Sequence, residues 1–587
     1  MKAFATSKKW LFFALIIIIF GLLSACSAAP AHEWTEAPGW SRARLIGETE
    51  SSFPVLPAID SEGNSYVATS HIEANVPIVR VSAFDANVEP LWQVDFSLTR
   101  LRRANKPSLV LSERGVEVFW ILDDNLFSAI ISPEGDIGSG SQRISGNREA
   151  IEYLAAVNNE GERILWFSGD RSQPGLYSID SGGNIATVDP DGFRPQIAFS
   201  NDGELHAIWT QNIIGDVDYH FYYAYYPDGE FVEDQEQLVH TTRVSVTSGI
   251  FGPKLGLDDS NVYIFWSELT RTGLSAGQVD SLFVSFPFGG GETLAEKPFP
   301  FPNGYSLVYS ESDAALKAGE RAYLAEQNAW AIPDLTDIYT NPVQSDELVV
   351  GIRSRLPYLR NKQATQVGLV FLDDSAVDSH QLISFTPGLS ELPTVQSDED
   401  GYLHLTWLEQ DQSNAYRLYY SSTAPAQRAA LDKLGSDDAT QLAGESIFGI
   451  LSGLVLIPLP ILWAFGPALL TFVTGPLRKE SEPITAPGTL ITLIAGVALH
   501  WFLKLVTLPG IATYVPFSAW IPILPKDWFD VLRYLVPILI GLTGLFAAWH
   551  LTFRRNNNTP LFFMLYFALI DGLLSMAVYG VLFYNAI

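Results

Sequence analysis

The C-terminal part of the chain is dominated by long apolar stretches that carry almost no charge. Residues 447–473 contain no charged side chain, and these 27 residues exceed the roughly 20 that a helix needs to cross a bilayer. Similar stretches follow at 485–503, 534–553 and 560–584. The pattern predicts an α-helical membrane domain over 446–587 with about four transmembrane helices.

Another uncharged stretch, 505–525, contains four prolines, which argue against a regular spanning helix. With four spans, the dibasic pairs Arg478-Lys479 and Arg554-Arg555 fall on the same side of the membrane. The positive-inside rule places that side in the cytoplasm. We therefore expect the large region before the first span to lie on the extracytoplasmic side of a bacterial plasma membrane.

Upstream of the spans, residues 35–425 consist of short alternating apolar runs broken by Gly, Asp, Asn and Ser, a pattern typical of β-strands. One motif recurs: a proline, an apolar pair, a polar turn, and an alternating strand that ends in tryptophan. Its four clearest copies run from Pro107 to Trp120, Pro195 to Trp209, Pro253 to Trp266 and Pro393 to Trp407. We expect these tryptophans to be buried between repeats.

Weaker copies begin near residues 57, 151, 305 and 357, so that successive starts are 36 to 58 residues apart. This period matches one four-stranded propeller blade. A single blade cannot bury both of its faces, so the repeats must close into a ring. The sequence therefore predicts an all-β propeller of about seven or eight blades over 46–428, followed by a linker at 429–445.

The repeats resemble those of the sialidase-like, BNR-type bacterial β-propellers over most of 50–425. The resemblance implies the propeller fold, and it raises a glycoside hydrolase of surface glycans as an alternative function. In that family's Asp-box, tryptophan follows glycine after three positions. Here Trp209 and Trp407 lie six positions after Gly203 and Gly401. This departure argues against sialidase chemistry, which also needs an arginine cluster, a tyrosine nucleophile and an acid.

The only cysteine of the chain, Cys26, ends the sequence Leu-Ser-Ala-Cys. A basic segment with Lys2, Lys8 and Lys9 and an apolar run precede it, as in a bacterial lipoprotein signal. We expect 1–25 to be a signal peptide, Cys26 to be lipidated, and 26–45 to be a tether.

The formal charge of −29 is concentrated in the region between Cys26 and the first span. Residues 27–444 contain 26 basic and 59 acidic residues. Such a region repels nucleic acid, so we expect no nucleic-acid partner. Membrane lipid, together with an unidentified protein or glycan, is the expected set of partners.

Two ionisable residues fall inside the predicted spans, His500 in the second and Asp571 in the fourth. An intramembrane carboxylate is costly unless it is paired or hydrated, so both are candidate functional residues. Lys504 and Arg533 lie near span ends, where we expect their side chains to reach outward to the membrane surface.

In the predicted propeller, His206 and His404 occupy equivalent repeat positions, which indicates a structural role. The acidic turns at 258–259 and 398–400 could hold calcium, although ordinary turn hydrogen bonding is the preferred interpretation. No other cofactor, metal site or catalytic residue is predicted.

The sequence shows no catalytic motif of the common nucleotide-binding, serine-hydrolase or zinc-protease types. We therefore interpret the chain as a membrane-anchored binding or scaffold module at the cell surface, and more as a binding protein than as an enzyme. The alternatives are a propeller glycoside hydrolase and a small membrane sensor or permease module with a propeller lid.

Overall fold

The computed structural model describes residues 39–299, 339–433, 451 and 458–579, with internal gaps. The gaps are 99–103, 159, 171–172, 213–216, 233–234, 246–247, 273–278, 292–294, 341–347, 360–361, 374–375, 385–388, 411–414, 452–457, 475–483, 485, 508–526 and 555–558. Cys26 and the expected signal peptide therefore lie outside the described residues.

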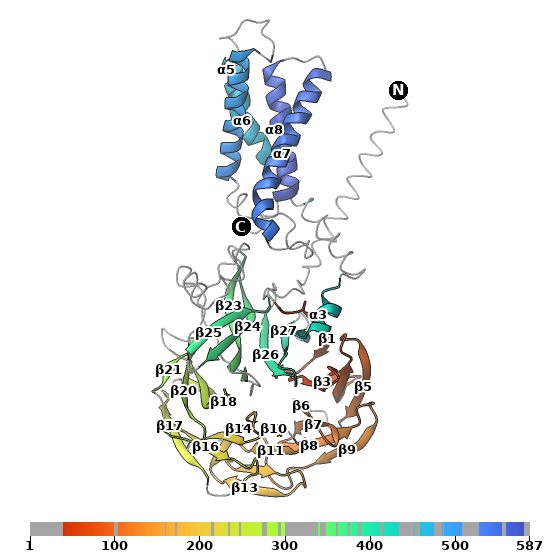
Figure 1. The fold of residues 1–587 in the computed structure, drawn as a ribbon, viewed down its shortest axis with the longest axis vertical. Coiled ribbons are helices and arrows are strands. Elements are labelled where there is room, and N and C mark those ends of the chain that lie inside the picture. The colour runs from red at the N-terminus through yellow and green to blue at the C-terminus, as the bar shows by residue number, and fades with distance from the viewer. Residues whose placement is uncertain are drawn as a thin grey trace.

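The N-terminal two thirds of the chain form seven four-stranded antiparallel sheets arranged around a common centre (Figure 1). The first three blades consist of β2 (Ala58–Ile59), β3 (Ser65–Glu73), β4 (Val76–Phe84) and β5 (Pro90–Ser97); β6 (Asn105–Ser112), β7 (Gly115–Leu122), β8 (Asn125–Ile131) and β9 (Ile137–Arg143); and β10 (Glu152–Val157), β11 (Arg163–Ser168), β12 (Leu176–Ile179) and β13 (Ile185–Asp189). The prediction of an all-β propeller is confirmed, with seven blades.

The fourth to seventh blades follow the same order of strands. They consist of β14 (Gly192–Phe199), β15 (Leu205–Gln211), β16 (Asp218–Tyr226) and β17 (Gln237–Arg243); β18 (Ser248–Leu257), β19 (Asn261–Thr270), β20 (Val279–Pro287) and β21 (Lys297–Pro298); β22 (Tyr339–Thr340), β23 (Leu348–Leu359), β24 (Lys362–Asp373) and β25 (Ala376–Leu382); and β26 (Ser390–Ser397), β27 (Leu403–Gln410), β28 (Tyr416–Ser422) and β1 (Arg44–Thr49).

The last blade closes the ring by combining the two ends of the propeller sequence. Strand β1 pairs antiparallel with β28, in a register that places Arg44 opposite Tyr420. Next to this pairing, the Ser41 amide donates to the Ser422 carbonyl at 2.8 Å, and the Ser422 amide donates to the Ser41 hydroxyl oxygen at 3.0 Å. Because β1 precedes the first blade, every blade is held between two neighbours.

The recurring proline of the repeat marks a bulge in the first strand of its blade. The residue before proline has a positive φ at Lys106 (50°), Arg194 (56°), Gly252 (102°) and Leu392 (56°). The pairing of each of these strands with the next strand shifts register at this point. A bulge re-aims nearby side chains, and here Lys106 and Arg194 are directed towards the following blade, as described below.

One of the weaker repeats does not begin a blade. Pro357 lies near the end of β23, the second strand of its blade, so the expected start at 357 is wrong. The expected start near 305 lies outside the described residues. In the long β23–β24 hairpin, a proline happens to precede an apolar run. Spacing along the sequence could not distinguish this arrangement from the start of a repeat.

The four repeat tryptophans lie between blades, as predicted. Trp120, Trp209, Trp266 and Trp407 are at most 1% exposed. Trp120 shares a cluster with Val81 of the first blade, and Trp266 shares one with Phe221 of the fourth. Each indole therefore packs against the preceding blade, where burial of its large apolar surface stabilises the junction.

The aromatic segment 219–226 also belongs to the core. It lies in β16, where Phe221, Tyr223 and Tyr226 are at most 3% exposed. These side chains are therefore part of the blade core and do not form an exposed stacking surface.

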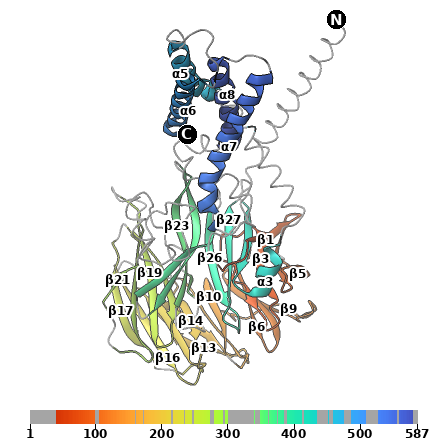
Figure 2. The ribbon, with the colours of Figure 1, turned by 45° about the horizontal axis from the view of Figure 1, so that its top comes forward.

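The C-terminal helices are α5 (Pro458–Thr474), α6 (Pro487–Thr507), α7 (Asp527–Arg554) and α8 (Pro560–Tyr579), and a short helix α3 (Pro425–Leu431) follows the propeller (Figure 2). Within the described residues, the segments 487–507, 534–554 and 560–579 are long and apolar enough to cross a membrane, and α5 is a shorter apolar helix. The first predicted span, which began at 447, is represented by this helix from Pro458 onward. The proline-rich stretch 505–525 lies largely outside the described residues.

Helix α8 packs against α5, α6 and α7. Glycines allow these helices to approach one another closely. A Cβ atom added to Gly572 would lie 2.5 Å from Cβ of Pro460, and one added to Gly544 would lie 3.1 Å from Cβ of Asp571. Small residues at crossing points allow such contact between helices in membranes.

Candidate functional sites

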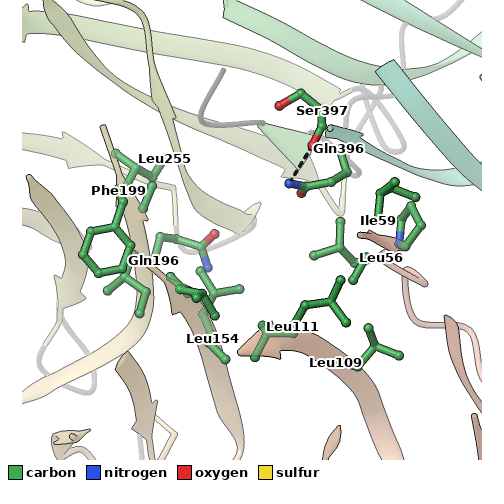
Figure 3. Close-up of a pocket in the computed structure, with 18 of the residues that line it drawn as sticks. Leu56, Ile59, Leu109, Leu111, Leu154, Gln196, Phe199, Leu255, Gln396 and Ser397 are labelled. Carbon is green, nitrogen blue, oxygen red and sulfur yellow. Dashed lines mark hydrogen bonds between the residues drawn. The ribbon is translucent and has the colours of Figure 1, made fainter. Parts of the chain in front are cut away.

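The propeller surrounds a central cavity of about 300 Å³. Its walls come from the first strands of six blades, β2, β6, β10, β14, β18 and β26, and are mostly aliphatic (Figure 3). The labelled side chains that surround the open space include Leu56, Leu111, Leu154 and Leu255. This volume is at the lower end of the roughly 300–1,000 Å³ typical of small-molecule sites.

Six polar side chains line the cavity, those of Gln196, Ser200, Asn201, Lys254, Gln396 and Ser397. Gln196 and Gln396 contribute amides from β14 and β26, and Gln396 Nε2 donates to the Ser397 carbonyl at 3.3 Å (Figure 3). Lys254 is the one charged residue among the described residues of the lining. The cavity can therefore hold an apolar group, but its described walls offer no carboxylate for acid–base chemistry.

Charged residues gather instead at the beginning of the first strands. Lys106 Nζ lies 3.3 Å from a carboxylate oxygen of Glu152 and 3.4 Å from the Ile151 carbonyl oxygen in the next blade. Arg194 donates from Nη1 to the carbonyl oxygen of Gly252, also in the next blade, at 3.0 Å. These cations thus tie neighbouring blades together. The sequence did not lead us to these residues, although Lys106 and Arg194 both stand directly before the recurring proline of the repeat.

The acidic turns use their carboxylates within the turn. In the turn at 398–401, one oxygen of Asp398 accepts from the Asp400 and Tyr402 amides at 3.1 and 2.8 Å, and the other lies 3.0 Å from His404 Nε2. Asp258 likewise accepts from backbone amides and from Tyr263. Within the described part of the chain, no three His, Cys, Asp or Glu residues are grouped to hold a metal ion. The calcium hypothesis stays untested.

The two repeat histidines are buried side chains that bridge strands. His206 Nδ1 lies 2.9 Å from the Tyr223 hydroxyl, and His404 Nδ1 lies 2.6 Å from that of Tyr420. Both rings are fully buried. Their equivalent contacts support the predicted structural role.

We expect the propeller to lose stability as the pH falls from about 6.5 towards 4. Burial lowers the pKa of His206 to about 4. The unfolded chain then binds a proton in this window that the folded chain does not, so the contribution present above pH 6.5 is lost on acidification. Its size is about 3 kcal/mol.

Urea unfolding of the full chain in nanodiscs, followed by tryptophan fluorescence across this pH window, measures the loss. The matched variant is His206→Gln, which keeps a polar side chain near Tyr223 but does not titrate. We expect it to flatten the pH dependence relative to the parent chain. An unchanged slope would assign the effect to another group.

In the helical part, the structure brings the two predicted residues into contact. His500 Nε2 on α6 lies 2.7 Å from Oδ2 of Asp571 on α8. A third residue, Lys504, lies one turn from His500 and donates from Nζ to the Asp571 carboxylate at 3.0 and 3.2 Å. All three side chains are fully buried. We call these three residues the helix triad.

The expectation that Lys504 reaches the membrane surface is wrong. Its ammonium group has an acceptor in Asp571 and lies 4.7 Å from the centre of the Trp501 ring. The pairing with a carboxylate on another helix outweighs the tendency of lysine to extend outward. The sequence could have suggested the pair, because His500 and Lys504 share one helix face. For Arg533, the side chain lies outside the described residues.

Aromatic side chains enclose the helix triad. The Phe567 ring is 5.1 Å from the His500 ring, and Trp463 on α5 supplies a carbonyl oxygen 3.4 Å from His500 Nδ1. The triad therefore links α6 to α8 and contacts α5. In apolar surroundings, a buried charge is costly unless a partner offsets the loss of hydration. Each of the three side chains therefore depends on the hydrogen bonds and charge of the others.

The fold defines the chain as a seven-bladed β-propeller that continues into apolar helices. No known family model matches the chain, and no curated protein matches it either. Solved structures with a similar arrangement include the polysaccharide lyase Uly1, at 9% identity and a TM-score of 0.43, where the match covers 64% of this chain and 90% of the lyase.

Two further similar structures are arabinan-degrading enzymes. An α-L-arabinanase of Penicillium chrysogenum matches at 8% identity and a TM-score of 0.29, covering 46% of this chain and 92% of that enzyme. An endo-arabinase from Bacteroides thetaiotaomicron matches at 13% identity and a TM-score of 0.24, covering 43% and 97%. At these scores, the similarities carry no argument about activity.

Proposed function

We propose that this protein is a membrane-anchored binding module whose propeller recognises a ligand through its central channel. The observation that carries the proposal is the channel itself, an open cavity of about 300 Å³ whose exposed surface is polar and apolar in about equal parts. A concave site that combines apolar surface with a small number of fixed polar groups is the usual form of a ligand-binding pocket. An extracellular protein or glycan is the ligand class that suits a surface-exposed propeller.

Binding is favoured over glycoside hydrolysis by the chemistry of the walls. Most glycosidases place two carboxyl groups on either side of the scissile bond. Among the described residues that line the cavity, the charged side chain is Lys254, a cation. Nearby Lys106 and Glu152 form an ion pair at 3.3 Å, and Arg194 bonds the backbone of the next blade. These groups support the ring rather than a reaction.

The proposed anchoring combines the apolar helices with a lipid on Cys26. In our proposal the propeller lies on the extracytoplasmic side of a bacterial plasma membrane. The dibasic pairs at 478–479 and 554–555 support this orientation through the positive-inside rule. Within the part of the chain that the structure describes, three helices are long and apolar enough to span a membrane, which supports membrane association.

A second candidate is a small membrane sensor or permease module, and the helix triad is the observation that favours it. Ionisable groups buried among apolar helices frequently mark transport pathways or switches. The variants of Asp571 and Lys504 described in the Discussion separate a purely structural triad from a functional one.

Ligand retention by oriented membrane vesicles tests the binding role. We expect right-side-out vesicles that carry the protein to retain members of a labelled panel of surface glycans and secreted proteins, without releasing cleaved products. Ala156→Trp should abolish retention, because this half-buried residue lines the channel and an indole would fill it. Thr187→Trp, at an exposed position on β13, is the matched control.

Three outcomes would contradict the proposal. Product release would indicate a hydrolase, and retention that survives Ala156→Trp would place the binding site outside the channel. Retention by inside-out vesicles alone would reverse the proposed orientation.

A further inference from the structure

A proline inside α5 leaves one backbone carbonyl without its usual partner. In an α-helix, each carbonyl oxygen accepts from the amide four residues further on. The residue four positions after Trp463 is Pro467, which has no amide hydrogen. Both residues are buried. Because an unpaired polar group is costly among apolar helices, the Trp463 carbonyl needs a donor from outside its own helix.

His500 on α6 is placed to supply this donor. Its Nδ1 lies 3.4 Å from the Trp463 carbonyl oxygen. The Trp463 ring meets the imidazole edge-on, with 6.2 Å between the ring centres, and its Nε1 donates to the Thr507 hydroxyl at 2.6 Å. The imidazole therefore contacts α5 at the carbonyl that lacks a hydrogen bond within its helix.

The second nitrogen of the same ring faces another acceptor. His500 Nε2 lies 2.7 Å from Oδ2 of Asp571, and the Lys504 ammonium group donates to the same carboxylate. A neutral imidazole carries one N–H, so it can donate to the Trp463 carbonyl or to Asp571 but not to both. The doubly protonated ring carries two N–H groups and satisfies both acceptors.

The charge of the helix triad opposes this second proton. The charges of Lys504 and Asp571 cancel, so the triad is neutral when the His500 ring is neutral. With a doubly protonated ring, it carries one net positive charge. A net charge is costly among apolar helices. The two acceptors therefore favour the second proton, and the burial of a net charge disfavours it.

The elements around the ring add no further charge to this balance. In their described residues, α5 has no titratable side chain and α6 has none besides the two members of the helix triad. On α8, the other titratable side chains are Tyr566 and Tyr579, and tyrosine is neutral up to about pH 10. The stretch 535–549 of α7, which approaches Asp571 through Gly544, has none.

We propose that the helix triad is a proton-binding site, in which His500 takes up a second proton and donates it to the carbonyl that Pro467 leaves free. Histidine changes its charge between about pH 5 and 8. The exchanging nitrogen is Nδ1, because its 3.4 Å contact is longer than an ordinary hydrogen bond, whereas Nε2 faces a carboxylate at 2.7 Å.

Proton uptake forms one N–H bond at Nδ1 and adds a hydrogen bond between α6 and α5. Proton loss to water removes both, so the proton decides how firmly α5 is held to the other two helices. This inference goes beyond the proposed binding role of the propeller and does not depend on it.

Nitrogen NMR of the full chain in nanodiscs, with 15N-labelled histidine, tests the proposal, because side-chain nitrogen shifts distinguish a neutral ring from a doubly protonated one. The signal that disappears in His500→Gln belongs to His500. We expect it to change from the neutral to the doubly protonated form between about pH 8 and 5. The matched control is His550→Gln, which removes an exposed histidine on α7 and should leave the His500 signal unchanged.

Pro467→Ala restores the amide hydrogen that the Trp463 carbonyl lacks. The carbonyl then has a donor within α5, so the second proton on His500 loses its acceptor. We expect the ratio of doubly protonated to neutral His500 at a given pH to fall about tenfold, the loss of one charge-assisted hydrogen bond. Pro537→Ala is the matched control, because Pro537 is a buried proline inside α7, and we expect the ratio to stay that of the parent chain.

Lys504→Met tests the charge balance. Without the ammonium group, a doubly protonated His500 and Asp571 form a neutral pair, so we expect the doubly protonated form to persist to higher pH than in the parent chain. A residue that serves packing alone would not show this response.

Four results would overturn the proposal. The first is a His500 ring that keeps one form from pH 8 to 5 in the parent chain. The second is a Pro467→Ala variant with the ratio of the parent chain, and the third is an equal fall in Pro537→Ala, which would assign the effect to helix stiffness. The fourth is a Lys504→Met variant with less doubly protonated His500 than the parent chain.

Discussion

Asp571→Leu is expected to destabilise the helical part by about 3–5 kcal/mol, since it removes one member of a buried ion pair and leaves the other. In the folded protein the Asp571 carboxylate accepts hydrogen bonds from Lys504 at 3.0 Å and lies 2.7 Å from His500 Nε2. Without this carboxylate, the ammonium group of Lys504 either stays buried without its partner or reaches water only if α6 shifts. Unfolding of the full chain in bicelles by added SDS measures the loss.

The double variant Asp571→Leu/Lys504→Met distinguishes charge pairing from simple packing. Replacing both members by apolar residues of similar size removes the unpaired charge, so we expect most of the lost stability to return. Ser575→Ala is the matched control, because Ser575 is also fully buried on α8, one turn beyond Asp571. A double variant as unstable as Asp571→Leu would contradict the pairing.

The same double variant addresses the role of the helix triad. If it is stable and still supports ligand retention by vesicles, the triad holds α6 to α8 and does no more. If it is stable but a transport or signalling output is lost, the sensor or permease candidate gains support. The double variant is needed for this comparison, because a loss of function in the unstable Asp571→Leu variant could come from unfolding alone.

Truncation of an inter-blade tryptophan is expected to cost the propeller about 3–5 kcal/mol, the usual range for a large buried aromatic residue. We expect the loss of stability in Trp209→Ala to lie at the upper end of this range. Its indole Nε1 donates to Asp189 at 2.6 Å, and its ring stacks on Tyr222 at 5.9 Å. The variant thus leaves a cavity and also deprives a buried carboxylate of a donor.

We expect this loss to appear as lower stability of the whole ring, because the β1–β28 pairing makes each blade depend on its neighbours. Trp120→Ala, Trp266→Ala and Trp407→Ala should behave alike. Trp92→Ala is the comparison: this indole on the outermost strand β5 also contacts the next blade, donating to the Pro133 carbonyl at 2.7 Å, but it is half-exposed, so its loss should cost less. Thermal unfolding followed by near-UV circular dichroism measures each variant. Inter-blade variants no less stable than Trp92→Ala would contradict the role of these residues in the core.

Much of the architecture could be predicted because it depends on local periodicity. Each blade repeats a proline, a turn and a strand ending in tryptophan, and burial of that tryptophan is a property of one repeat and its neighbour. The apolar helices follow from composition alone. The false start at Pro357 shows the limit, because a hairpin within one blade can mimic the beginning of another.

The sequence by itself therefore determined the fold class, the position of the apolar helices and the two residues, His500 and Asp571, that are unusual within them. Tertiary structure alone decided which groups meet. Lys504 lies 67 positions from its partner Asp571, and β1 closes a blade whose other strands lie more than 300 residues away. Contacts at such separations leave no periodic trace along the chain.

The ion pair between neighbouring inner strands shows the same limit. Lys106 and Glu152 are single charges in an acidic sequence, and only the packing of neighbouring blades brings their side chains to 3.3 Å. Charge along a chain sets solubility, whereas the field that a ligand meets depends on distances in space.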